Sequence, residues 1–203
     1  GAKVVVNDLG GARDGTGTSD AAAQVVEQIK SAGGEAMANG GSVTEYEQMV
    51  EMVAKAKEAW GGVHVLINNA GIQPLGVSFA ELTPQLLQRT LEVNVHSVAF
   101  GIKHGAKMLP RGGRIINTGS FVGLLGSPAG TAYSTSKAAV IHLTKLGAIE
   151  LAARGITVNC VQPGAIATGM TRSLFDDTPG AKDYYAGRSA LGRVGQPEDV
   201  ADV

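Results

Sequence analysis

The sequence predicts an α/β protein with a doubly wound parallel sheet between two layers of helices, a three-layer, Rossmann-like fold. Short β-branched runs alternate with helical patterns along the chain, as is typical of a parallel sheet with helices on both faces. The 203 residues, 44% of them hydrophobic, suit one globular domain with a sizeable core. No repeat, low-complexity tract or linker divides the chain, so residues 1–203 are expected to form a single domain.

The strands are predicted from apolar runs bounded by turn residues. Strands are expected over residues 4–6, 63–68, 114–117 and 156–161. A dinucleotide-binding unit of this type opens with a strand, a glycine-rich turn and a helix, whereas residues 4–6 correspond to the second strand of such a fold. The chain is therefore expected to lack the first strand with its glycine-rich turn, and also the last strand, as if shortened at both ends.

The helices are predicted from their caps. The first begins at Thr18 or Ser19 and stops at Gly33. The second is expected to begin in a capping box over residues 44–47. Thr83 and the following proline supply an N-cap and an N1 proline for a long helix that ends near residue 110, and a further helix covers residues 132–155.

Composition excludes several classes of partner. Seventeen basic and eighteen acidic residues give a net charge of −1 without a basic run, so a nucleic-acid partner is not expected. No apolar segment approaches the ~18 residues of a membrane span, and the N-terminus lacks the organisation of a signal peptide. The single cysteine, Cys160, permits no internal disulfide and indicates a reducing, cytoplasmic setting. No metal site is expected, because the histidines do not cluster; they are His64, His96, His104 and His142.

Tyr133 and Lys137 stand four residues apart on a predicted helix, so the phenol and the ammonium can reach the same point in space. A free tyrosine has a pKa near ~10, and proton transfer near neutrality requires a lower value. One ammonium ~5 Å away, at an effective dielectric constant of ~20, supplies about 3.3 kcal/mol toward that shift. Taken alone, the pair is also compatible with an interfacial aromatic and a solvated helix charge.

Further motifs surround this pair at ordered spacing. Ser120 lies thirteen residues before Tyr133, Asn68-Asn69-Ala70-Gly71 follows an apolar run, Asn94 lies between them, and Pro163-Gly164 follows the next predicted strand. Together they resemble the short-chain dehydrogenase/reductase family over nearly the whole chain. The resemblance implies a catalytic set of Asn94, Ser120, Tyr133 and Lys137. In it Ser120 positions the substrate oxygen, Tyr133 transfers the proton, and Asn94 distorts its helix and holds a water that contacts Lys137.

The resemblance also implies the cofactor contacts. Asp8, at the end of the first predicted strand, matches the position whose carboxylate binds the adenosine ribose and repels a 2′-phosphate, so NAD is expected. Two alternatives remain: Asp8 can be an ordinary turn residue, and Arg13 can reach a 2′-phosphate. The glycine-containing loop over residues 10–17 could replace the missing pyrophosphate-binding turn, but its glycines do not fit the G-x-G-x-x-G spacing. The expected cofactor-binding residues are Asp8, Ser42, Val43, Asn68, Ala70, Gly71, Tyr133, Lys137, Pro163, Gly164, Ile166 and Thr168.

The predicted function is NAD-dependent interconversion of a secondary alcohol and a ketone on a small-molecule substrate. Apolar residues near the site suggest a pocket wall; they are Phe121, Leu124, Leu125 and Leu174. The alternatives are a 3-hydroxyacyl-thioester dehydrogenase of the same family and a non-catalytic binding or regulatory protein. By resemblance, the long helices pair between subunits in a homodimer or homotetramer, with contacts at Ala99, Gly101, Ala138, Ala139, Gly147 and Ala148.

Overall fold

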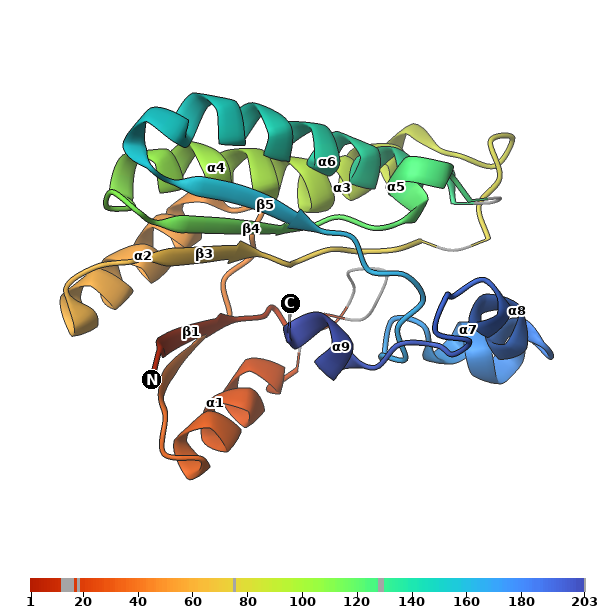
Figure 1. Ribbon diagram of the computed structural model, residues 1–203, viewed down its shortest axis with the longest axis horizontal. Coiled ribbons are helices and arrows are strands. Elements are labelled where there is room, and N and C mark those ends of the chain that lie inside the picture. Colours follow the sequence, from red (N-terminus) through yellow and green to blue (C-terminus); the bar gives the residue numbers. More distant parts are fainter. Residues whose placement is uncertain (12–16, 18, 75, 128–129, 203) are drawn as a thin grey trace.

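The computed structural model describes residues 1–11, 17, 19–74, 76–127 and 130–202, in which parallel strands alternate with helices (Figure 1). The elements are β1 (Lys3–Asn7), α1 (Ala21–Ser31), β2 (Glu35–Asn39), α2 (Tyr46–Trp60), β3 (Val65–Asn68), α3 (Pro84–Leu91), the π-helix η1 (Glu92–His96), α4 (Ser97–Met108), β4 (Arg114–Thr118), α5 (Val122–Leu125), α6 (Thr131–Leu151), the 3-10 helix η2 (Ala152–Arg154), β5 (Thr157–Val161), α7 (Arg172–Asp177), α8 (Ala181–Gly187) and α9 (Pro197–Ala201).

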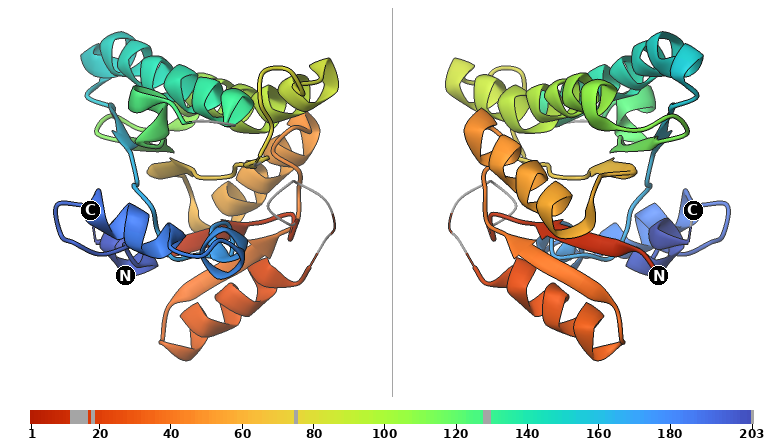
Figure 2. Two further views of the ribbon diagram at one scale, coloured as in Figure 1. Left: turned by 90° about the vertical axis from the view of Figure 1, so that its right-hand side faces the viewer. Right: turned by 90° about the vertical axis from the view of Figure 1, so that its left-hand side faces the viewer.

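All strand pairs are parallel, and the strands form two groups. β1 pairs with β2, and β4 lies between β3 and β5. Helices α4 and α6 pack on the three-stranded group, while α1 packs on the β1–β2 pair at the opposite side of the molecule (Figures 1 and 2). This arrangement confirms the Rossmann-like α/β fold. No strand within the described residues lies between β1 and β3.

The main apolar core joins α6 to the three-stranded group. Ile115 of β4 is fully buried, and it packs with Val158 of β5, Leu151 at the end of α6, Leu109 and Ile156. Burial alternates along β4: Ile115 and Asn117 are fully buried, whereas the residues on either side of them are not. This core fixes the direction of β4 and β5, whose carboxyl ends carry the predicted site.

The helix starts follow the predicted caps in one case and not in another. Thr83 is the N-cap of α3, and its hydroxyl accepts a hydrogen bond from the Leu86 amide at 3.2 Å, with Pro84 at N1. The predicted capping box before α2 does not form, because the Thr44 hydroxyl bonds that of Ser42 and Glu45 is the N-cap instead.

Two elements differ from the sequence-based expectation. β2 was not predicted, since none of its five residues belongs to the β-branched and aromatic set that favours strands and its extended form depends on pairing with β1. The single long helix predicted from Thr83 is interrupted by η1, in which Asn94 lies. A π-helical turn is an inserted residue in the hydrogen-bond pattern, and it occurs often at functional sites. None of the helices in the described part of the chain is both long and apolar enough to cross a membrane.

Candidate active site

The predicted site residues gather at the carboxyl ends of the strands, where ligands bind in open α/β sheets. Ser120 follows β4, and the residues on either side of it are tied to the segment after β5. The Gly119 amide donates to the Val161 carbonyl at 2.8 Å, and the Phe121 amide donates to the Pro163 carbonyl at 3.2 Å. These two bonds fix the backbone that carries the Ser120 hydroxyl.

The structure brings Ser120, Tyr133 and Lys137 together. The Ser120 and Tyr133 hydroxyls are hydrogen-bonded. The Lys137 ammonium lies 5.6 Å from the centroid of the Tyr133 ring, one helical turn further along α6. A hydroxyl, a phenol and an ammonium thus line up on one side of α6, which is a geometry suited to passing a proton to or from a substrate oxygen.

Lys137 is buried without a counter-charge. Its side chain is only 4% exposed, and its ammonium donates to the Thr118 carbonyl at 2.7 Å. Among the described residues this carbonyl is its one hydrogen-bond acceptor, and no ion pair involves it. Burial lowers the pKa of Lys137 to about 8, and the nearby Cys160 opposes that shift. An ammonium has three donors, so two remain available for a ligand.

The pKa of Tyr133 differs from the expectation that Lys137 lowers it. Burial raises the pKa of Tyr133 above its ordinary value, and the hydrogen bond from Ser120 acts in the opposite direction. The ammonium is engaged with the Thr118 carbonyl and does not contact the phenolic oxygen. In this state the phenol is therefore held in its neutral form.

Asn94 lies in the π-helical turn and is fully buried. Its amide makes a two-way contact with the Ile72 backbone, accepting from the Ile72 amide at 2.8 Å and donating to the Ile72 carbonyl at 2.9 Å. The same amide nitrogen donates to the Ser136 hydroxyl, which donates in turn to the Tyr133 carbonyl. Asn94 thus joins the loop after β3 to the first turns of α6, and its side-chain hydrogen bonds go to Ile72 and Ser136 rather than to Lys137.

Asn68 is directed away from the open edge of the sheet and into the helix layer. Its amide donates to the Asn117 side chain at 2.8 Å, and the Asn117 amide donates to the Thr144 hydroxyl of α6 at 2.9 Å. A Cβ at Gly101 of α4 would lie 2.3 Å from the Asn68 side-chain oxygen, so only glycine leaves room for it. In this structure the side chain of Asn68 therefore connects the end of β3 to β4 and, through Asn117, to α6.

The loop after β3 places backbone close to the Lys137 ammonium. A Cβ at Gly71 would come within 3.4 Å of the Asn94 side-chain oxygen and 3.5 Å of the Lys137 ammonium. Asn69, two residues earlier, accepts a hydrogen bond from the Thr118 hydroxyl at 3.0 Å, which aligns the loop with the end of β4. Ala70 and Gly71 thus present backbone beside a buried, incompletely bonded ammonium, and a ribose diol would supply the acceptors it lacks.

The predicted adenosine-side residues follow β1 and β2. The Asp8 carboxylate accepts a hydrogen bond from the Gly10 amide at 2.6 Å, which is the turn-holding role left open from the sequence. The Ser42 hydroxyl bonds that of Thr44 at 2.8 Å. Val43 lines a pocket of about 330 Å³ together with residues of α3, η1 and α4, among them Arg89 and Glu92. Arg13 and most of the 10–17 loop lie outside the described residues.

The segment after β5 contains the remaining predicted contacts. Pro163 is joined to Phe121 as described above, and Ile166 forms an isolated parallel bridge with Gly195. The Thr171 hydroxyl donates to the Ile166 carbonyl and accepts from the Thr168 amide, which closes a compact turn. No group of three potential metal ligands is found within the described residues.

Comparisons with known proteins identify the family. A family model described as enoyl-(acyl carrier protein) reductase matches residues 1–203. The chain is 39% identical over 188 residues to the 3-oxoacyl-(acyl-carrier-protein) reductase FabG of Staphylococcus epidermidis, which covers 92% of this chain and 75% of that protein. The chain belongs to the short-chain dehydrogenase/reductase family.

Other relatives agree with this assignment. The chain is 35% identical over 205 residues to cyclohexanol dehydrogenase of Acinetobacter sp., covering 100% of this chain and 76% of the relative. A short-chain dehydrogenase from Burkholderia cenocepacia, solved in complex with NADP, superposes with a TM-score of 0.86 at 35% identity, covering 100% of this chain and 78% of that one. This short-chain dehydrogenase/reductase is accordingly an NAD(P)-dependent oxidoreductase acting between alcohols and carbonyl compounds.

Two contributors to the site of this short-chain dehydrogenase/reductase were not predicted from the sequence. Thr118 binds Lys137 through its carbonyl, and a backbone acceptor has no signature in the sequence. Ser136 is fully buried between Asn94 and the Tyr133 carbonyl. Its position three residues after Tyr133 places both on neighbouring parts of the helix surface, and that spacing is the signal that could have indicated it.

The buried ammonium predicts a specific pH dependence of stability. The pKa of Lys137 is about 8 in the folded chain against 10.5 for a free lysine, so between these values the unfolded state binds more protons. The free energy of unfolding should therefore rise with pH across this window, by roughly 3 kcal/mol at most. We expect the difference between wild type and Lys137→Met in urea unfolding to grow in favour of wild type from pH 8 to pH 10. The exposed Lys145→Met on the same helix is the control, and a flat difference would contradict the burial argument.

Proposed function

We propose that the enzyme interconverts a secondary alcohol and a ketone, with Tyr133 as the proton donor and acceptor. The observation that carries the proposal is the alignment of the Ser120–Tyr133 hydrogen bond with a buried Lys137 that lacks a counter-charge. Buried lysines without a counter-charge are unfavourable, and they are found where a ligand or a reaction needs them.

The chemistry divides between cofactor and chain. The nicotinamide supplies or accepts the hydride. In the reduction, the substrate carbonyl oxygen takes the proton of the Tyr133 phenol, and Ser120 donates a hydrogen bond to the same oxygen. We assign Ser120 a positioning role rather than a nucleophilic one, since its described partners are the Tyr133 phenol and the Val122 amide and include no histidine or carboxylate that would activate it.

Lys137 is proposed to have two roles, one in cofactor binding and one in stabilising the phenolate of Tyr133. When the nicotinamide-side ribose binds beside Gly71, the ammonium can bond its hydroxyls, and its charge then favours the phenolate of Tyr133. Asn94 supports this arrangement by fixing the Ile72 backbone and, through Ser136, the first turn of α6. The family resemblance implies a water that connects Asn94 to Lys137. Because the Asn94 side-chain amide is bonded to Ile72 and Ser136, we assign the contact with this water to the backbone of the π-helical turn.

Tyr133→Phe in the full-length protein should remove most turnover while leaving NADH affinity nearly unchanged, because the hydroxyl acts in proton transfer rather than in cofactor binding. Steady-state kinetics and fluorescence titration of NADH measure the two effects separately. Tyr46→Phe, at the start of α2 and half exposed, is the matched control. Turnover like that of wild type in Tyr133→Phe would refute the role of Tyr133.

We propose NAD as the preferred cofactor because Asp8 places a carboxylate at the end of β1, where it can accept bonds from a ribose diol and repel a 2′-phosphate. The NADP-bound relative shows that the fold also accepts the phosphorylated cofactor. The preference therefore depends on this carboxylate and not on the fold.

Asp8→Ala should narrow the preference for NAD in kcat/KM, since losing a charge-assisted hydrogen bond corresponds to roughly 1.5 to 3 kcal/mol, or about 10- to 150-fold in affinity. Asp8→Asn separates the two roles of this residue: it keeps an acceptor for the Gly10 amide and removes the charge. Both variants should shift toward NADP. A wild-type preference for NADP that Arg13→Ala abolishes would instead assign the ribose contact to Arg13.

A second substrate class is favoured by one relative. FabG of Staphylococcus epidermidis is named as a 3-oxoacyl-(acyl-carrier-protein) reductase, which favours the hydroxyacyl-thioester alternative. The leucines of α5, Leu124 and Leu125, are 65% and 77% exposed immediately after Ser120 and could contact an acyl chain. Comparing kcat/KM for a 3-oxoacyl thioester and a simple cyclic ketone separates the two classes.

We propose a homodimer or homotetramer formed through α4 and α6. Both helices expose large apolar side chains, among them Phe100, Leu146 and Ile149. The small residues Gly101 and Gly147 do not serve this contact, contrary to the prediction, because they face Asn68 and Ile102 of the same chain. Light scattering of the full-length protein should give a dimer or tetramer, and Ile149→Asp should reduce the mass. A monomer across the micromolar range would refute this assembly.

A further inference from the structure

The segment after β5 is held in place by the C-terminal part of the chain. The Gly195 amide donates to the Ala165 carbonyl at 2.9 Å, and the Ala167 amide donates to the Gly195 carbonyl at 2.8 Å. These two bonds surround Ile166, so Gly195 acts as a short parallel strand for residues 165–167. Ile166, in this stretch, and Thr168, just after it, are among the residues that the family resemblance implies at the nicotinamide end of the cofactor.

The Gly195 backbone lies close to the Ile166 side chain. A Cβ at Gly195 would lie 2.5 Å from the Ile166 side chain, well inside van der Waals contact. Val194, the residue before, is 4% exposed and anchors this stretch in the molecule. The position of Ile166 is therefore set by the path of the backbone from residue 193 to residue 196.

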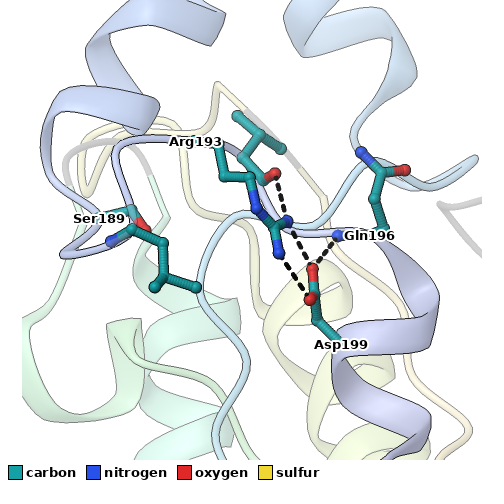
Figure 3. A network of polar contacts seen from close by, with 6 residues as sticks. Ser189, Arg193, Gln196 and Asp199 are labelled. Atoms are coloured by element: carbon teal, nitrogen blue, oxygen red, sulfur yellow. Dashed lines mark hydrogen bonds and ion pairs between the residues drawn. The ribbon is translucent and has the colours of Figure 1, made fainter.

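The backbone from residue 193 to residue 196 is held in place by the carboxylate of Asp199. Asp199 of α9 accepts two hydrogen bonds from the Arg193 guanidinium, both at 2.7 Å, and a third from the Gln196 amide, also at 2.7 Å (Figure 3). Gln196 and Asp199 are also the two residues of the capping box that begins α9. Arg193 in addition donates to the Val194 carbonyl at 3.3 Å. The residues on both sides of Gly195 are thus fixed to the same carboxylate.

This ion pair is too exposed to serve mainly as a source of stability. The side chains of Arg193 and Asp199 are 48% and 37% exposed, and pairs of this kind contribute little to the free energy of unfolding. A two-bond guanidinium–carboxylate contact does, however, restrict geometry in a way that a lysine cannot. What it restricts here is the turn that presents Gly195 to Ile166.

We propose that Arg193 and Asp199 are positioning residues for the cofactor: their ion pair holds Gly195 against residues 165–167 and so sets where Ile166 and Thr168 meet the nicotinamide. The proposal rests on the proposed function of that segment. Small displacements of positioning groups remote from the reacting atoms lower both binding and rate. Arg193 and Asp199 touch neither substrate nor cofactor in this account.

The first test does not require the cofactor. Hydrogen exchange of the Ala167 and Gly195 amides should be faster in Arg193→Met than in wild type by roughly 2- to 5-fold, in keeping with the loss of an exposed ion pair. The Gly119 amide, bonded to Val161 on the other side of the site, is the internal control and should not change. Unchanged exchange at Ala167 and Gly195 would overturn the proposed clamp, whether or not the chain binds NADH.

The second test measures the consequence for the cofactor. NADH affinity by fluorescence titration should fall roughly 2- to 5-fold in Arg193→Met and in Asp199→Asn, with no further loss in the double variant because both remove the same contact. Arg193→Lys, which keeps the charge without the two-bond geometry, should resemble Arg193→Met. Lys3→Met removes the similarly exposed Lys3–Glu35 pair at the opposite ends of the strands and should not change affinity.

The two tests separate the inference from the proposed function. Faster exchange with unchanged NADH affinity would show that the clamp exists but does not position the cofactor, which overturns the proposal. Additive losses in the double variant would also overturn it, because the two residues would then act independently. If wild type binds no NADH, the proposed function fails, while the exchange result still decides whether the clamp exists.

Discussion

The hydrogen bond between the Lys137 ammonium and the Thr118 carbonyl is the interaction on which the rest of the site depends. A buried cation with a single neutral partner is unfavourable unless that partner is fixed, and the carbonyl is fixed because it is the last residue of β4. The Thr118 hydroxyl simultaneously positions Asn69. One residue at a strand end therefore connects α6 to the loop beside which the cofactor is proposed to bind.

Two different kinds of contact attach α6 to the sheet. Near the site it is held by the polar chain from Asn68 through Asn117 to Thr144, whose geometry is directional. At its far end it is held by the apolar cluster around Ile115 and Leu151, which is not directional. Orientation is thus controlled where Tyr133 and Lys137 must be placed accurately, and burial supplies stability where orientation matters less.

The sequence was sufficient for the fold class, and helix periodicity correctly placed Tyr133 and Lys137 on one side of a helix. Ser120 was indicated by the family resemblance. The sequence was not sufficient for Thr118, whose functional atom belongs to the backbone. Nor did it indicate η1, since one extra residue in a helical hydrogen-bond pattern has no compositional mark. The side-chain partners of Asn68 and Asn94 depend on packing between distant segments, which local pattern does not determine. The roles of the cofactor residues remain predictions.

The exposed helix faces have a consequence for behaviour in solution. Phe100 of α4 and Leu146 and Ile149 of α6 expose large apolar side chains. Contacts between such faces that are related by a two-fold axis close on themselves, because each subunit uses the same patch. Particles of one defined size would therefore indicate that the subunits pair through these helices.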